Sequence, residues 1–76
     1  MTSMADHPGA TRFVVLRVGE PLQSDNDLLE RMSSAGIEPG ATVSITRADD
    51  RIDLAGPSGA VTIDGGQSGY LFGSPA

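Results

Sequence analysis

The sequence predicts a small all-β domain with one short helix, in the order β-α-β-β-β-β. Several short runs alternate apolar and polar side chains, as half-buried strands do, whereas only one segment has helical spacing. A chain of 76 residues has room for a single domain. A small antiparallel sheet hides its edges best by curling, so we expect a partly open β-barrel.

The first strand and the helix come from the first half of the chain. Residues 12–18 are rich in β-branched and apolar side chains, and Val14, Leu16 and Val18 fall on one face of the expected strand. The Ser-Asp-Asn-Asp run at 24–27 then offers an N-cap and acidic side chains for the first turn of a helix. The apolar positions of that helix are Leu28, Leu29, Met32 and Ala35.

Glycine and proline mark the turns that follow. Gly36 suits the left-handed position that ends a helix, and Pro39-Gly40 suits a type II turn. Alternating segments then predict three strands joined by short turns, and a last strand after Gly65-Gly66. These strands are residues 41–47, 51–55 and 60–63, with the last at Tyr70 to Phe72.

Both ends of the chain look different from this core region. Residues 1–10 mix small, polar and helix-breaking residues without periodicity, which predicts a flexible leader or interdomain linker. The domain itself is expected over residues 11–73, followed by a flexible tail at 74–76. His7, in the leader, is given no role.

Composition limits the chemistry. The chain has no cysteine, which excludes disulfides and thiolate metal sites. Ten acidic residues against five arginines give a net charge of −5, so we expect no direct contact with nucleic acid. No apolar run approaches the about 20 residues that cross a bilayer, and we expect a cytoplasmic protein without membrane insertion. Without a histidine in the folded part there is no Ser-His-Asp arrangement, and we expect no enzyme.

Two further features have ordinary structural explanations. The acidic residues Asp49, Asp50 and Asp53 lack the spacing of an EF-hand and suit a solvated turn. The glycines of residues 56–59 and 65–66 lack the lysine and the strand-loop-helix context of a phosphate-binding loop, and are expected to form turns.

From the helix onward, the chain resembles the SH3-like domain shared by diphtheria-toxin-repressor-type iron-dependent regulators and by ferrous-iron-transport protein A. The resemblance covers roughly residues 12–72 and departs at residues 67–70, where the repressors usually carry an Ala-His-Ala-like run. It implies an SH3-like (FeoA-like) barrel from a bacterial protein. The family pattern L-x-x-h-x-x-x-G-h-x-P-G-x-x-V-x-V, with h apolar, is filled by Leu29, Met32, Gly36, Ile37, Pro39, Gly40, Val43 and Ile45.

Just before the helix, the repressors carry a Glu-x-x-Gln pair that the transport proteins generally lack, and this chain has Glu20 and Gln23. The resemblance implies that both contribute oxygen ligands to a metal site otherwise built by preceding domains. Carboxylate and amide oxygens suit Fe²⁺ or Mn²⁺, and Pro21 in a β-turn would hold the two Cα atoms within about 7 Å. Two donors are far short of about six, so we expect the isolated domain to bind metal weakly or not at all. The alternative is that both are solvated surface residues.

Three functions remain open. The first is a regulatory domain of a metal-dependent repressor, for which the resemblance implies winged-helix and dimerisation domains of the same protein as partners, a homodimer, and contact with a proline-containing linker. The second is a stand-alone accessory protein of ferrous-iron transport that acts by protein contact. The third is a peptide- or linker-binding module without metal, for which the chain offers few aromatic residues, namely Phe13, Tyr70 and Phe72.

Overall fold

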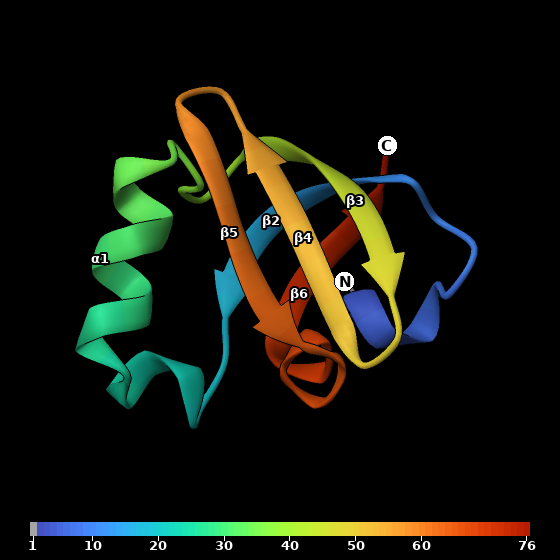
Figure 1. The fold of residues 1–76 in the computed structure, drawn as a ribbon, viewed down its shortest axis with the longest axis horizontal. Helices are drawn as coiled ribbons and strands as arrows, with labels where there is room; N and C mark the ends of the chain where they lie inside the picture. Colours follow the sequence, from blue (N-terminus) through green and yellow to red (C-terminus); the bar gives the residue numbers. More distant parts are fainter. Residues whose placement is uncertain (1) are drawn as a thin grey trace.

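A six-stranded antiparallel sheet forms most of the protein in a computed structural model that describes residues 2–76; residue 1, part of the expected leader, lies outside the described residues. The strands follow the order β1-β6-β2-β3-β4-β5 across a sheet that curls into a partly open barrel, as predicted (Figure 1). Their bounds are β1 (Thr2–Ser3), β2 (Arg12–Val18), β3 (Ala41–Ala48), β4 (Arg51–Gly56), β5 (Gly59–Asp64) and β6 (Leu71–Pro75). The α-helix is α1 (Asn26–Ser34), and the 3₁₀ helices are η1 (Met4–Asp6), η2 (Leu22–Ser24) and η3 (Gly65–Tyr70).

The hydrophobic core lies inside the curled sheet. On β3, β4 and β5, every second side chain points inward, which confirms the predicted alternation. The inward residues of these strands are Val43, Ile45, Ile52, Leu54, Val61 and Ile63. Among residues 2–76, no helix is long and apolar enough to cross a bilayer.

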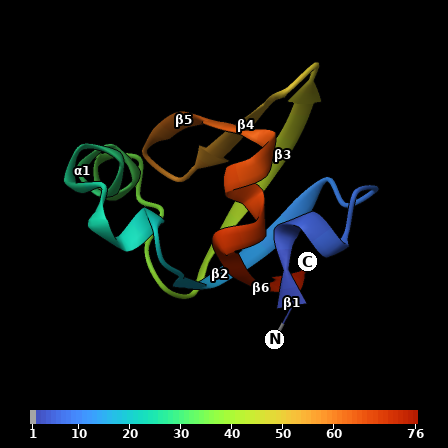
Figure 2. The ribbon, with the colours of Figure 1, turned by 90° about the horizontal axis from the view of Figure 1, so that it is seen from below.

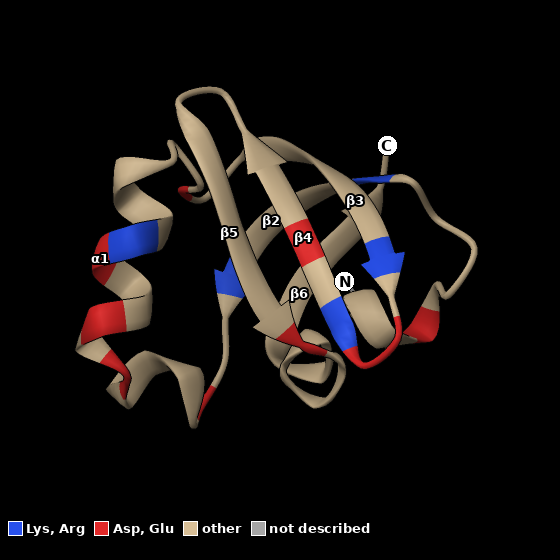
Figure 3. Ribbon diagram, viewed as in Figure 1, with Lys and Arg blue, Asp and Glu red and all other residues tan. Residues whose placement is uncertain are grey.

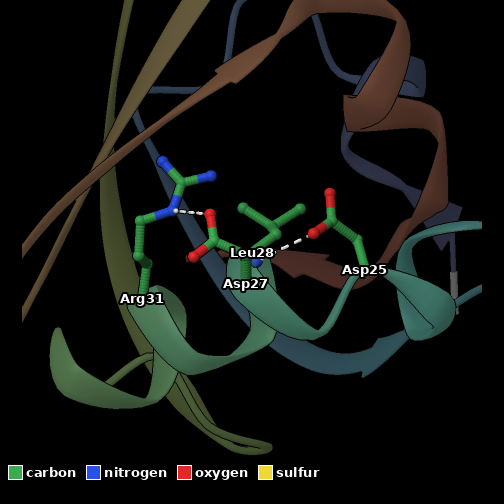
Figure 4. A network of polar contacts seen from close by, with 4 residues as sticks. All are labelled: Asp25, Asp27, Leu28 and Arg31. Carbon is green, nitrogen blue, oxygen red and sulfur yellow. Dashed lines mark hydrogen bonds and ion pairs between the residues drawn. The ribbon is translucent and has the colours of Figure 1, made fainter.

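The helix begins and ends where its sequence predicts. The carboxylate of Asp25 accepts a hydrogen bond from the backbone N–H of Leu28 (3.0 Å), which caps α1, and an exposed ion pair joins Asp27 to Arg31 at 3.4 Å (Figure 4). At the other end, Gly36 has a φ of 78°, the left-handed conformation that ends a helix. The apolar side of α1 is buried through Leu28, Met32 and the following Ala35, whereas Leu29 is half-buried.

The buried face expected for β2 is wrong. Phe13 and Val15 are the buried residues, and Leu16 is 45% exposed. The register of β2 against β6 shifts between Val15 and Arg17, which is the mark of a β-bulge with Leu16 as the extra residue. A bulge interrupts strict alternation, so a pattern that assumes a period of two assigns the wrong face.

Both ends of the chain are built into the barrel, in contrast to the expected flexible leader and tail. Thr2 and Ser3 pair with β6, and Met4 in η1 is completely buried. The 3₁₀ helix η1 lies beside η3 (Figure 2). Ser74 and Pro75 belong to β6 and pair with β2. The glycines at 65–66, predicted to form a turn, begin η3, where the hydroxyl of buried Ser68 donates to the carbonyl of Gly65 at 2.6 Å.

Candidate functional site

The segment between β2 and α1, residues 19–25, carries both predicted metal ligands, and we call it the ligand turn. Its start is tied to the sheet, because the N–H of Gly19 donates to the carbonyl of Tyr70 at 2.7 Å. Its middle is held by Leu22, which is buried in the core. Its end is the N-cap of α1, Asp25. The ligand turn is therefore anchored at its start, middle and end.

Gln23 has a defined side-chain position on this turn. Its Nε2 donates to the carbonyl oxygen of Val18 at 2.6 Å. A carbonyl oxygen can only accept, so the nitrogen of the amide must face it and Oε1 is the atom that remains for another partner. The side chain is exposed, and the amide oxygen is therefore the part of Gln23 that a second domain or an ion can reach.

Glu20 precedes Gln23 by three residues and is also exposed. The peptide bond between Glu20 and Pro21 is cis. The hydrogen bond that closes the turn runs from the N–H of Gln23 to the carbonyl of Gly19 at 3.2 Å, one residue earlier than in the predicted β-turn. The carboxylate and the amide thus lie on one short exposed turn between the same two elements.

No complete metal site is present among residues 2–76, because no three His, Cys, Asp or Glu side chains come together there. Glu20 and Gln23 offer one carboxylate group and one amide oxygen, which are donors of the kind that divalent metal ions accept but fall far short of the about six that such an ion needs. His7 lies elsewhere, and its Nε2 is 2.6 Å from the hydroxyl of Thr2.

The remaining acidic residues do not extend the ligand turn into a larger site. Figure 3 shows acidic residues along α1 and at the turn between β3 and β4. Asp49, Asp50 and Asp53 are all exposed, and Asp53 accepts a hydrogen bond from the hydroxyl of Thr62 at 2.6 Å. This acidic group is a solvated turn next to a cross-strand pair.

The family model of the diphtheria toxin repressor SH3 domain matches residues 4–66 of this sequence. The chain belongs to this family. The match confirms the resemblance and includes Met4, which the structure places in the core. A search of curated proteins finds no match to the SH3 domain described here.

Two solved structures share the fold of this SH3 domain. The metal-dependent transcriptional regulator MtsR superposes with a TM-score of 0.70 at 13% identity, and the match covers 99% of this chain but 36% of the regulator. The iron uptake regulatory protein FeoA superposes with a TM-score of 0.66 at 14% identity, over 99% of this chain and 97% of that protein. The SH3 domain thus spans about a third of the regulator and nearly all of FeoA.

One surface feature of the SH3 domain is missing from the sequence-based predictions. Arg17 and Phe72 lie on the outer face of β2 and β6, and exposed Leu16 precedes Arg17 in β2; we call these three residues the outer cluster. Arg17 and Phe72 are cross-strand partners, and the guanidinium carbon of Arg17 lies 5.3 Å from the centre of the Phe72 ring. Only the pairing of β2 with β6 reveals this cluster, because the bulge at Leu16 has no signature in the sequence.

Proposed function

We propose that this SH3 domain is the regulatory domain of an iron- or manganese-dependent transcriptional repressor in the bacterial cytoplasm. In this proposal, Glu20 and Gln23 contribute oxygen ligands to a metal site that other domains of the same protein complete. Family membership supports the regulatory role. The observation that carries the ligand role is the 2.6 Å hydrogen bond from Gln23 Nε2 to Val18, which leaves the amide oxygen available on the same exposed turn as Glu20.

The domain would act by binding and not by catalysis. A bound divalent ion would supply a link between the SH3 domain and the domains that hold the other ligands. Glu20 and Gln23 bind such an ion strongly only in the domain arrangement that brings all ligands together, so that arrangement is favoured by the difference in metal affinity. The net charge of −5 disfavours contact with DNA, and operator binding is therefore assigned to winged-helix domains of a homodimer.

Operator binding by the complete protein tests the proposal. A DNA duplex is selected from a random pool with the Mn²⁺-loaded wild type, and binding is then titrated with Mn²⁺. Glu20→Ala and Gln23→Ala are each expected to raise the Mn²⁺ concentration needed for half-maximal binding. The control is Glu38→Ala, which removes an exposed acid from another turn and should bind like the wild type. Unchanged Mn²⁺ dependence in both test variants would overturn the ligand role.

A second candidate is favoured by the match to FeoA, which covers almost the whole of both chains. In that case the domain would be a free accessory protein of iron uptake that acts through protein contacts. An immunoblot of the native organism with an antibody to this domain separates the two. The repressor proposal predicts a polypeptide about three times as long as this chain, as in the 36% coverage of the regulator, whereas a band of the domain's own size favours the accessory protein.

A further inference from the structure

An open groove lies between α1 and β5, outside the ligand turn, and we call it the edge groove. Its volume is about 620 Å³, within the range of about 300–1,000 Å³ that is usual for ligand-binding clefts. One wall includes Asp27 and Glu30 of α1, and the other is residues 58–62. The walls meet where the N–H of Ser58 donates to the carbonyl of Ala35 at 2.9 Å, and they diverge toward the start of α1 (Figure 1).

The strand that lines this groove, β5, is an edge of the sheet. It is six residues long, it pairs with β4 without a register shift, and its one charged residue, Asp64, is at its end. The other edge strand, β1, has only two residues. Natural proteins usually shorten, bulge or block their edge strands, because unpaired backbone groups would otherwise pair with another chain. A regular strand such as β5 is therefore able to accept a further strand.

Two hydrogen bonds show which backbone groups of β5 face the groove. The N–H of Gly65 donates to the carbonyl of Asp50 at 2.6 Å, so in this antiparallel ladder every second residue before Gly65 bonds to β4. The residues between them direct N–H and C=O to the free edge, and the N–H of Asp64 accordingly donates to Oε1 of Gln67 at 2.9 Å. The other two such residues of β5, both exposed and without a partner for their N–H among residues 2–76, are Ala60 and Thr62.

The side chain of Thr62 does not block this edge. Its hydroxyl donates to the carboxylate of Asp53 on β4 at 2.6 Å, which turns the side chain toward β4 and away from α1. Ala60 has only a methyl group. The backbone of β5 is thus accessible to a chain that lies in the edge groove.

The α1 wall gives the edge groove a negative charge. Asp27, Glu30 and Arg31 line it, and the single ion pair among residues 2–76 joins Asp27 to Arg31. These two charges offset each other, and Glu30 is left without a cation. Asp64 is also exposed, and the whole chain carries a net charge of −5 (Figure 3). A lysine or arginine side chain complements such a surface.

The lining of the groove also distinguishes between kinds of peptide. No aromatic side chain lines it, whereas domains that bind proline-rich segments use grooves lined by aromatic residues. A segment that adds a strand needs a row of unpaired backbone groups instead, with space beside them. The edge groove provides both.

We propose that the edge groove binds an extended, basic segment of a partner protein. The segment pairs with β5 as a seventh strand of the sheet, bonds to the backbone of Ala60 and Thr62, and places a lysine or arginine beside Glu30. This interaction adds a binding site for a partner polypeptide to the proposed function and does not depend on the metal ligands.

Peptide selection with the 76-residue chain tests the edge groove. Random dodecapeptides displayed on phage are selected for binding, and the strongest binders are synthesised. We expect them to contain lysine or arginine between β-branched residues and no central proline. Each is titrated into the ¹⁵N-labelled domain. The amide signals of Ala60 and Thr62 should shift, and their hydrogen exchange should slow about tenfold at nine-tenths occupancy, because the peptide then shields them from water.

Variants at one position separate the backbone contact from the side chain. Ala60→Pro removes an N–H that faces the groove and no bond to β4, so we expect it to weaken peptide binding about tenfold. Ala60→Val is the matched control, because it retains this N–H, and should bind like the wild type. Glu30→Arg should weaken binding about fivefold, whereas Glu38→Arg, an exposed acid outside the groove, should not.

Failure to select any peptide would overturn the proposal, and so would selection of proline-rich or acidic sequences. Signal shifts confined to residues outside the edge groove, or equal affinities of Ala60→Pro and Ala60→Val, would also contradict it. Shifts of Ala60 and Thr62 that appear without peptide, as the domain concentration rises, would assign the groove to a second copy of the chain. If Ala60→Pro does not fold, Glu30→Arg and hydrogen exchange decide. The metal role is tested separately by Glu20→Ala and Gln23→Ala.

Discussion

The side-chain amide of Gln23 is hydrogen-bonded to the backbone carbonyl of Val18, five residues earlier in the chain. This contact connects the last residue of β2 to the ligand turn through a side chain that is itself exposed. An exposed neutral hydrogen bond contributes little to stability but restricts the conformations of the side chain. The hydrogen bond to Val18 therefore fixes the position of the Gln23 side chain, although the domain does not need this contact in order to fold.

Gln23→Ala should for this reason lower the free energy of unfolding by about 1 kcal/mol or less. Urea unfolding followed by circular dichroism measures the change. A loss of about 3 kcal/mol or more, which is typical of buried groups, would show that the turn depends on this contact. Any effect of the variant on metal activation would then reflect damage to the fold.

Met4→Ala should destabilise the domain by about 2–5 kcal/mol, because Met4 is fully buried and its removal leaves a cavity. The control is Ala5→Ser, which changes the exposed neighbour in η1 and should have almost no effect. Thermal unfolding of both variants gives the comparison. A Met4→Ala variant as stable as the wild type would mean that the N-terminal segment does not pack onto the barrel in solution.

Gly73→Ala should destabilise the domain strongly, by about 3 kcal/mol or more, because a Cβ there would overlap the carbonyl oxygen of Val14 on the paired strand. Gly66→Ala is the matched control, since nothing lies within 4 Å of the new methyl group. It should be neutral or stabilise the domain by a few tenths of a kcal/mol, on the order expected from a less flexible unfolded chain. Equal unfolding midpoints for the two variants would contradict the close approach of β2 and β6.

Asp25→Ala should cost about 1 kcal/mol, because it removes the N-cap of α1. Asp27→Ala is expected to change stability much less, since the ion pair of Asp27 with Arg31 is exposed to solvent and such pairs contribute about 0–1 kcal/mol. Chemical denaturation of the two variants measures the difference. A larger loss for Asp27→Ala would mean that the ion pair, and not the cap, determines where the helix begins.

The parts of the fold that the sequence predicts well are those that depend on local signals. Gly36 and Gly40 adopt positive φ angles of 78° and 92°, as the turn residues predict. The alternation in β3, β4 and β5 and the cap at Asp25 are likewise readable within a few residues of chain. Each of these features is determined by side chains close to it in sequence.

The features that were missed depend on contacts between distant segments. Met4 is buried by elements at the other end of the chain, and the bulge at Leu16 exists only in the pairing of β2 with β6. The candidate site likewise has some features that the sequence shows and others that it does not. The residue types of Glu20 and Gln23 and their spacing are visible in the sequence, whereas the contact of Gln23 with Val18 and the adjoining outer cluster require the three-dimensional structure.

The affinity of the complete protein for Mn²⁺ is the most direct test of the ligand role of Glu20 and Gln23. The electron paramagnetic resonance signal of free Mn²⁺ reports how much of the ion is bound to the wild type, Glu20→Ala, Gln23→Ala and the control Glu38→Ala. Both ligand variants should bind Mn²⁺ about tenfold more weakly or worse, at least the loss that follows removal of an outer-shell partner, while Glu38→Ala binds like the wild type. Wild-type Mn²⁺ affinity in both Glu20→Ala and Gln23→Ala would contradict the proposal that these two residues are metal ligands.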